Sequence, residues 1–423
     1  MNPGWQTVPM SAVMTEFYDG PHATPPPADD GPIYLGIKNM TEDGHLDLSE
    51  IRHIAEKDYP EWTRRVEPRA GDVVFTYEAS LHRYAIIPAG FRGTLGRRVA
   101  LLRADPRVIN TRFLVYAFMS PLWRRTVEER LNIGSTVDRL PLIDFPNFPI
   151  TIPSLEVQRK IAAVLSPYDD LIENNTRRIK VLEEMAQRIY REWFVDFRYP
   201  GHQADEPLVE TQLGAAPASW EQWNLADLVT TQYGFTASAS TAPVGPKFLR
   251  GMDINKASYI DWSTVPFCSV SADEHERYRL GPDDVVVVRM ADPGKVGIVE
   301  TAIDAIFASY LIRLAPAAQQ LQPYFLFYLL ISQQYQQFAR GASSGTTRQS
   351  LSAPGITNVQ IALPPLDVQV SFDRFVRPMR KAMARLLEAN AVLRHTRDLF
   401  LPRLISGEID VENLAIAVED AAA

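Results

Sequence analysis

Few residues in this chain have the spacing of a catalytic site. Gly294-Lys295 comes nearest to a Gly-x-x-x-x-Gly-Lys phosphate loop, but Arg289 stands where the first glycine of that loop should be. No two histidines have the i, i+4 spacing with which a helix binds zinc. The histidines are His22, His45, His53, His82, His202, His275 and His395. Solvated or capping roles are the better interpretation of each.

The acidic residues do not form a recognisable metal site either. The pairs Asp169-Asp170 and Asp283-Asp284 fit a helix start and a turn better than a cation site. A nuclease would need carboxylates and a lysine around a metal ion on adjacent strands, and no such cluster is identifiable. We therefore expect a chain that is not an enzyme and that holds no metal and no cofactor.

The composition is that of a soluble globular protein. Of the 423 residues, 46% are hydrophobic and 22% are charged, and the mean hydropathy is −0.14. This length predicts two or three domains. There is no run of about 18 apolar residues and no secretory layout at the N-terminus, so we expect a cytoplasmic protein without a membrane span. The single cysteine, Cys268, can form no internal disulfide.

The net charge is acidic. The chain has 43 Lys and Arg against 51 Asp and Glu, a net of −8, whereas a DNA-binding domain usually has a basic excess. Net charge is a sum over the whole chain, however, and only the surface that meets phosphate must be positive. Residues 92–112 hold six arginines and the single acid Asp105. A solvated surface and a binding surface explain that stretch equally well.

The most informative feature is an internal repeat. An offset of 211 carries residues 150–158 (ITIPSLEVQ) onto residues 361–369 (IALPPLDVQ). An offset of 212 carries Asp72-Val73-Val74 onto Asp284-Val285-Val286. Each half begins with about 150 residues in which short β-branched runs alternate with turn signals, and ends in a long amphipathic segment. The repeat predicts two copies of an α+β domain, each followed by a long helix.

The two amphipathic segments have matching apolar stripes whose steps alternate between four and three. This spacing is typical of a coiled-coil seam, and its recurrence favours a dedicated helix pair over ordinary core packing. The predicted seam residues are Ile161, Leu165, Ile172, Asn175, Ile179, Leu182 and Ile189 in the first segment, and Val376, Met383, Leu386, Asn390 and Leu393 in the second.

Each seam holds one asparagine, and the two lie at inequivalent positions of the repeat. Residues that face each other in an antiparallel pair have a constant sum of residue numbers, and Asn175 with Asn390 gives 565. The same sum pairs residue 161 with 404 and residue 193 with 372, so the two seams overlap from end to end. We expect an antiparallel pair with Asn175 facing Asn390, because a buried asparagine fixes the register when it meets another.

Prolines occupy the same repeat position in both segments, at Pro167 and Pro378. Since proline is tolerated in the first turn of a helix and kinks its interior, we expect a short helix before each long one. Ser166 would cap the first long helix. Arg397 falls on a seam position where the first copy has Ala186, and we expect it at a frayed helix end with its head in water.

The chain resembles the specificity subunits of type I restriction-modification systems over nearly its whole length. The residues that carry the resemblance are Ile152-Pro153-Ser154-Leu155-Glu156-Val157-Gln158 with the helix that follows, Trp193-Phe194-Val195-Asp196-Phe197, Leu401-Pro402-Arg403-Leu404-Ile405-Ser406-Gly407-Glu408-Ile409, Gly71-Asp72-Val73-Val74-Phe75, and Arg289-Met290-Ala291-Asp292-Pro293-Gly294-Lys295-Val296-Gly297. The duplicated order of domain and helix is more specific than any of these motifs.

The resemblance implies a non-catalytic subunit that recognises a split, asymmetric site on double-stranded DNA. It implies two target recognition domains held apart by an antiparallel helix pair, two methyltransferase subunits that dock on the helices, and motor-nuclease subunits that the complex can recruit. S-adenosylmethionine would then belong to the methyltransferase, and ATP and Mg²⁺ to the restriction subunit. Half-sites about one DNA turn apart, roughly 34 Å, suit a duplicated reader.

The repeat and the resemblance divide the chain into six parts. Residues 1–150 form target recognition domain 1, residues 151–200 the first long helix, residues 201–215 a linker, residues 216–363 target recognition domain 2, residues 364–411 the second long helix, and residues 412–423 a tail.

Candidate DNA contacts follow from residue type, because arginine and lysine read guanine and bind phosphate whereas asparagine and glutamine read adenine. The candidates are Lys38, Asn39, Arg83, Arg97, Arg98, Ser135 and Thr136 in the first half, and Arg250, Arg289, Lys295, Thr346, Thr347, Arg348 and Gln349 in the second. The loops at residues 134–136 and 345–347 could also recur for folding reasons alone.

Two other functions stay open. A coiled-coil scaffold that binds proteins and not DNA would suit the acidic net charge, and it would show no salt-sensitive DNA binding. An endonuclease or methylase acting alone is the third, and the missing phosphate, cofactor and metal motifs disfavour it.

Overall fold

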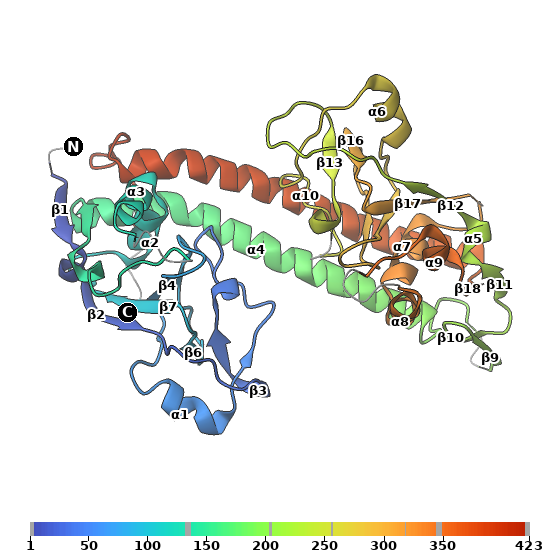
Figure 1. Ribbon diagram of the computed structural model, residues 1–423, viewed down its shortest axis with the longest axis horizontal. Coiled ribbons are helices and arrows are strands. Elements are labelled where there is room, and N and C mark those ends of the chain that lie inside the picture. Colours follow the sequence, from blue (N-terminus) through green and yellow to red (C-terminus); the bar gives the residue numbers. More distant parts are fainter. Residues whose placement is uncertain are drawn as a thin grey trace. The chain divides into compact units, whose positions relative to one another are not determined.

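The computed structural model describes residues 4–131, 137–202, 205–254, 257–317, 319–343 and 349–418 (Figure 1). Two long helices, α4 (Leu155–Phe194) and α10 (Leu366–Ile405), run through it. The contacts divide the chain into a first unit, Met1–Asp170 with Leu393–Ala423, and a second unit, Leu171–Val392. Each unit therefore contains one segment of each long helix.

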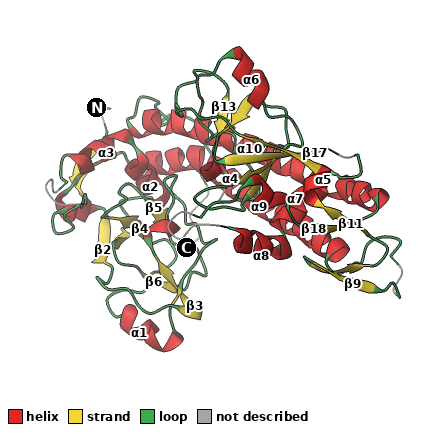
Figure 2. Ribbon diagram, turned by 45° about the vertical axis from the view of Figure 1, so that its right-hand side comes forward, coloured by secondary structure: helices red, strands yellow, loops and turns green. Residues whose placement is uncertain are grey.

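The first unit combines short strands with short helices (Figure 2). Its strands are β1 (Gln6–Pro9), β2 (Met14–Asp19), β3 (Ala28–Leu35), β4 (Val73–Thr76), β5 (Tyr84–Ile86), β6 (Gly93–Leu95), β7 (Val99–Ala104) and β8 (Pro149–Ile152), and its short helices are α1 (Tyr59–Trp62), α2 (Thr111–Met119) and α3 (Pro121–Glu128). The main sheet has the antiparallel order β2-β7-β4-β5. Beside it, β3 pairs with β6 in parallel and β1 pairs with β8 antiparallel.

The second unit repeats this plan. Its strands are β9 (Leu208–Thr211), β10 (Gly214–Pro217), β11 (Glu221–Asn224), β12 (Val229–Tyr233), β13 (Lys247–Leu249), β14 (Val285–Val288), β15 (Val296–Ile298), β16 (Ala305–Phe307), β17 (Leu311–Pro316) and β18 (Gln360–Leu363), and its short helices are α5 (Leu225–Leu228), α6 (Ala272–Tyr278), α7 (Pro323–Ile331), α8 (Gln333–Ala342) and α9 (Ala353–Thr357). The main sheet has the order β12-β17-β14-β15, while β13 pairs with β16 in parallel and β11 with β18 antiparallel.

The predicted internal repeat is confirmed element by element. An offset of 212 carries β4 onto β14, β6 onto β16, β7 onto β17 and α2 onto α7, and an offset of 211 carries α4 onto α10. The correspondence extends to backbone conformation, since Ala79 and Ala291 lie at equivalent positions and have positive φ angles of 71° and 73°. Two tandem mixed domains with long helices, the predicted fold class, are present.

Alternation along the central strands builds the core on both faces of the sheet. In β14, Val285 and Val287 pack in one buried cluster and Val286 and Val288 pack in another. Successive side chains of a strand point to opposite faces, so four consecutive buried valines require apolar neighbours on both sides. Helices α7 and α8 cover the first of these faces, and the Ser332 side chain begins α8 by accepting a hydrogen bond from the Tyr335 N–H at 3.3 Å.

The long helices pack against each other antiparallel within each unit. In the second unit, Asn175 Nδ2 donates to Asn390 Oδ1 at 2.9 Å, and the rings of Phe194 and Phe372 lie 5.0 Å apart. In the first unit, Asp169 pairs with Arg397. The residue numbers of these three pairs sum to 565, 566 and 566, as the antiparallel register requires. Asn175 and Asn390, the predicted seam residues among these pairs, are both buried.

The predicted break at Pro167 and Pro378 is wrong. Helix α4 continues through Pro167, and α10 continues through Pro378. A proline inside a helix costs about 3 kcal/mol because it removes one hydrogen bond and crowds the preceding turn. Both prolines lie on the exposed side of their helices, where water can solvate the released carbonyl group, while Leu165 and Val376 are buried on the opposite side. Burial of the seam outweighs the local cost.

Two further expectations are corrected. The predicted linker, residues 201–215, contains β9, which forms an antiparallel hairpin with β10, so the chain is already part of the second unit there. Arg397 is not at a frayed end but is only 2% exposed. Its guanidinium finds a buried carboxylate partner, which the sequence pattern of one helix does not reveal.

Candidate nucleic-acid interface

The turn between β14 and β15 carries two of the predicted contacts, Arg289 and Lys295. The Val288 N–H donates to the Lys295 carbonyl at 2.8 Å, and the Gly294 N–H donates back to the Val288 carbonyl at 2.9 Å. Gly294 has a φ angle of +95°, a conformation that favours glycine. This closed turn leaves the Lys295 side chain exposed at the edge of the sheet.

Arg289 is held in place without a carboxylate. Its backbone N–H donates to the Tyr310 carbonyl at 2.9 Å, its carbonyl accepts from the Leu351 N–H at 2.8 Å, and its guanidinium lies 5.1 Å from the centre of the Tyr233 ring. Within the described part of the chain it makes no ion pair, and its Nε has no hydrogen-bond partner. Its Nη1 lies 3.6 Å from Met290 Sδ, a weak acceptor. A positioned guanidinium without a carboxylate partner suits binding to guanine O6 and N7.

The other second-half candidates divide between this edge and elsewhere. Gln349 is exposed next to Ser350, which pairs with Met290 of the same turn. Thr346, Thr347 and Arg348 lie outside the described residues. Arg250 stays a prediction, and in this structure its guanidinium donates to Asp253 through two hydrogen bonds of 3.0 and 2.8 Å. Three candidates therefore lie at this edge of the sheet, Arg289, Lys295 and Gln349, and together they are called the second-unit edge.

The equivalent turn of the first unit, between β4 and β5, has different chemistry. Tyr77 takes the position of Arg289, and the carboxylate of Glu78 follows it. Glu78 pairs with Arg98 at 2.8 Å and with Arg139 at 3.8 Å, and the Arg139 guanidinium lies 5.7 Å from the Tyr77 ring centre. The candidate Arg98 is thus part of an internal ion pair.

The remaining first-half candidates are scattered or engaged. Lys38 pairs with Glu50 at 3.1 Å, and Arg83 pairs with Glu42 at 3.4 Å, whereas Arg97 is exposed and makes no ion pair with a described residue. Asn39 is corrected as a base contact, because it is 2% exposed and its amide bonds the backbone of Gly36, Asp47 and Glu50. Ser135 and Thr136 lie outside the described residues.

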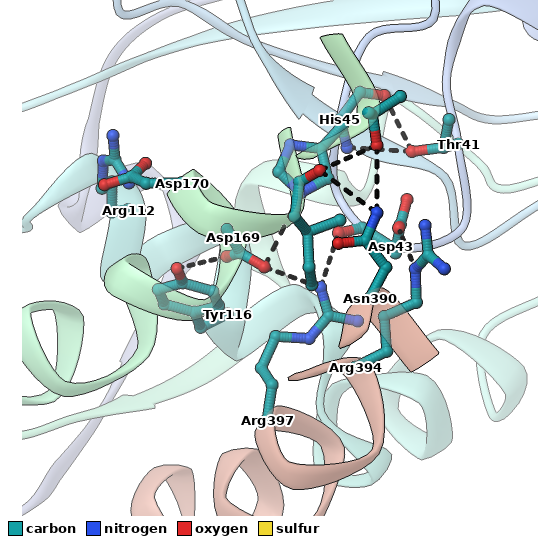
Figure 3. A network of polar contacts seen from close by, with 12 residues as sticks. Thr41, Asp43, His45, Arg112, Tyr116, Asp169, Asp170, Asn390, Arg394 and Arg397 are labelled. Carbon is teal, nitrogen blue, oxygen red and sulfur yellow. Dashed lines mark hydrogen bonds and ion pairs between the residues drawn. The ribbon is translucent and has the colours of Figure 1, made fainter. Parts of the chain in front are cut away.

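A buried polar network joins the long helices to the mixed part of the first unit. Figure 3 shows Asp169 of α4 between Tyr116 of α2, whose O–H donates at 2.5 Å, and Arg397 of α10, which donates at 2.7 Å. Burial alone would raise the pKa of Asp169, but its contacts with His45, Tyr116 and Arg397 outweigh that effect and hold the pKa below its usual range. The carboxylate therefore stays ionised inside the unit.

A second network occupies the matching place in the second unit. Arg380 of α10, at 0% exposure, donates to Glu183 of α4 at 2.6 Å, to Glu300 at 2.8 Å and to the Ser258 carbonyl at 2.8 Å. Burial acts to lower the pKa of Arg380, but Glu300 and the other neighbours raise it above its usual value. Arg380 stands at the repeat position of Asp169, so the two units use opposite charges at one place in the fold.

Arg380 was missed by the sequence interpretation although a signal for it exists. It lies four residues after Val376 and three before Met383, on the buried side of the helix, where an unpaired charge would be costly. Such a charge predicts a buried partner of opposite sign. The sequence does not say which acidic residue supplies it, because Glu300 lies in a loop 80 residues away.

No group of three or more His, Cys, Asp and Glu side chains among the described residues could hold a metal ion. None of the described helices is long and apolar enough to cross a membrane.

Comparisons with known proteins agree on one family. The family described as "Type I restriction modification DNA specificity domain" matches residues 34–184 and 219–380. Among curated proteins, the chain is 24% identical to the type I restriction enzyme MjaIX specificity subunit of Methanocaldococcus jannaschii, over 86% of this chain and 83% of that protein. It is 23% identical to the MjaVIII specificity subunit of the same organism, over 77% of this chain and 76% of that protein.

A solved structure has the same fold. The crystal structure of a type I restriction-modification system S subunit from M. genitalium matches with a TM-score of 0.55 and 14% sequence identity, over 95% of this chain and 96% of that chain. The family matches the chain twice, as the internal repeat requires.

Proposed function

Because the chain belongs to the type I restriction-modification DNA specificity family, we propose that it is the non-catalytic subunit that recognises a bipartite, asymmetric DNA site and directs methylation and restriction to it. The observation that carries this proposal is one fold present twice with different side chains at the same edge. The second-unit edge presents Arg289, Lys295 and Gln349, and the first unit has Tyr77 and Arg83 at the positions of Arg289 and Lys295. Two readers that differ in this way should read two different half-sites.

The proposal assigns partners and chemistry as follows. Double-stranded DNA binds the two mixed domains, residues 1–150 and 216–363. Two methyltransferase subunits dock on the long helices. Motor-nuclease subunits join the complex, which acts in the cytoplasm. S-adenosylmethionine serves the methyltransferase, and ATP and Mg²⁺ serve the restriction subunit. Exposed apolar side chains on α4 support docking of a protein there: Leu171, Val181 and Met185 are 49%, 53% and 46% exposed.

Domain exchange tests the proposal against a scaffold that binds only protein. Residues 1–150 are replaced by the equivalent part of a relative with a different known site, and binding to a library of duplexes is measured with the methyltransferase present. One half of the recognised site should change and the other half should stay. A change in both halves would refute the division into two readers, and an absence of salt-sensitive binding by the unaltered complex would favour the scaffold.

A further inference from the structure

Beside the second-unit edge lies a cleft of about 610 Å³ whose charged lining residues are all cations. Arg191 comes from α4, Lys295 from the turn between β14 and β15, and Arg340 from α8. Among the described residues that line the cleft there is no aspartate and no glutamate. Three like charges around one space repel each other, and a bound anion would relieve that repulsion.

The three cations are free to bind such an anion. Each side chain is exposed, and none of them makes an ion pair with a described residue. In the same unit, Arg250, Arg313, Arg377 and Arg380 all pair with carboxylates. The cleft cations therefore differ from the structural arginines beside them.

Fixed geometry accompanies the charge. The Gln336 amide of α8 donates to the Gly294 carbonyl at 2.7 Å and to the Leu330 carbonyl at 2.6 Å, which ties the helix to the turn that carries Lys295. The N-terminal residues of α8, Gln333 and Gln334, also line the cleft, and a helix N-terminus adds a partial positive charge.

The fold itself does not require two of these cations, Arg191 and Arg340, as the first unit shows. The position equivalent to Arg340 is Glu128, that of Gln187, another lining residue, is Asp398, and that of Arg191 is Pro402. In the first unit an acid thus replaces the cation Arg340, and a second acid replaces the neutral amide Gln187. Lys295 does have a cationic counterpart, Arg83, so it is the combination of three cations that is particular to the second unit.

We propose that Arg191, Lys295 and Arg340 bind a phosphodiester of the DNA backbone next to the bases that the second-unit edge reads. The inference rests on the proposed function and deepens it. Lys295 lines the cleft and belongs to the same turn as Arg289, so the turn connects the cleft to a side chain suited to a base. In a chain of net charge −8, a local cluster of this kind is what makes phosphate binding favourable. Arginine matches phosphate oxygens in a bidentate geometry.

The test is the salt dependence of DNA binding by the full chain assembled with its methyltransferase. Variants R191Q, K295Q and R340Q are compared with R374Q, a control that removes an exposed α10 cation lying outside the cleft lining and without an ion pair to a described residue. Each lost phosphate contact should make the negative slope of log K against log salt shallower by about 0.9, so the fall in affinity between 50 and 200 mM salt becomes about 3.5-fold smaller. The slope of R374Q should equal that of the unaltered chain.

The pattern over sequences separates phosphate contacts from base contacts. The ratio of affinities for the cognate duplex and a single-substituted duplex should be unchanged in R191Q and R340Q, because phosphate contacts carry no sequence information. R340E, which installs the first unit's residue type, should weaken binding more than R340Q.

Two results would overturn the inference while the proposed function stands. In the first, R191Q and R340Q bind the cognate duplex specifically and have the same salt slope as R374Q and the unaltered chain. Alternatively, they could weaken assembly with the methyltransferase at an unchanged salt slope, which would assign the cleft to an acidic group of the protein partner. If the unaltered complex showed no salt-sensitive binding to any duplex, the proposed function itself would fail, and with it the inference.

Discussion

Replacing Arg380 with methionine should destabilise the second unit strongly. Methionine keeps an unbranched stem of similar volume but removes the charge that binds Glu183 and Glu300. Arg380 is 0% exposed and the Glu300 side chain is 6% exposed, so the variant leaves a carboxylate buried without its cation. Removing one partner of a buried ion pair costs about 3–5 kcal/mol, much of it the penalty of the charge left behind.

The loss should depend on pH in a direction that the structure sets. Burial raises the pKa of Glu300 and Arg380 opposes that rise, so without Arg380 the pKa rises further. An acid whose pKa is raised on folding contributes stability below its unfolded pKa, about 4.3, and that contribution is lost as the pH rises through the folded value. The R380M defect should therefore be largest at neutral pH and should shrink as the pH falls and Glu300 takes up a proton.

Hydrogen exchange measured by mass spectrometry resolves the effect by unit. Since about 1.4 kcal/mol is a factor of ten, a loss of about 3–5 kcal/mol lowers protection in β14, β17 and α7 by about 10²- to 4 × 10³-fold. Peptides from β4 and β7 of the first unit serve as an internal reference. The matched control is R385M, which removes an exposed arginine of the same helix and should change stability by less than about 0.5 kcal/mol.

Two outcomes would refute this reasoning. R380M could lose no more protection than R385M, which would mean that the buried contacts contribute nothing. Alternatively, the double variant R380M/E300Q could be no more stable than R380M at neutral pH, which would mean that the orphaned charge is not the cause of the defect.

Three other predictions concern single side chains. N175L and N390L should each lower the free energy of unfolding, measured with urea, by about 1–3 kcal/mol, because each leaves the buried amide of the other asparagine without its partner. The double variant N175L/N390L should be less destabilised than either single variant. A double variant less stable than both single variants would contradict the pairing. Burial would lower the pKa of His45, but Asp169 and Asp43 raise it above its usual value. The contribution of His45 to first-unit stability is therefore present below about pH 6.5 and is lost as the pH rises through the folded-state pKa. H45Q should make hydrogen exchange protection less dependent on pH between pH 6 and 8, and an unchanged pH dependence would count against this role. R289M should lose about 1–3 kcal/mol of discrimination at one base pair of one half-site in duplex competition, and a uniform loss over all sequences would make Arg289 a phosphate contact instead.

The sequence could predict those features that two copies of one pattern share. The repeat of β4 and β14, and the pairing of Asn175 with Asn390, follow from offsets and sums that any antiparallel pair must satisfy. A single stripe would have been ambiguous between a core helix and a helix pair. The second copy removes that ambiguity because both stripes must be buried in one register.

The errors come from interactions between segments that are distant in sequence. Pro167 looks like a helix start, but burial of the seam on the opposite side outweighs its local cost. Arg397 looks exposed until Asp169, 228 residues away, supplies a carboxylate. Asn39 looks like a base contact, yet its amide serves the surrounding backbone. Residue type alone does not distinguish a free donor from one already bound inside the fold.

The central claim is that this chain determines where a methyltransferase acts, and a base-modification map tests it most directly. The methyltransferase is expressed with and without this chain in a host that lacks other adenine methylation, and the genomic DNA is read natively. We predict methyladenine at one split, asymmetric motif only when the chain is present. The same methylated sites in both cultures, or none in either, would contradict the claim.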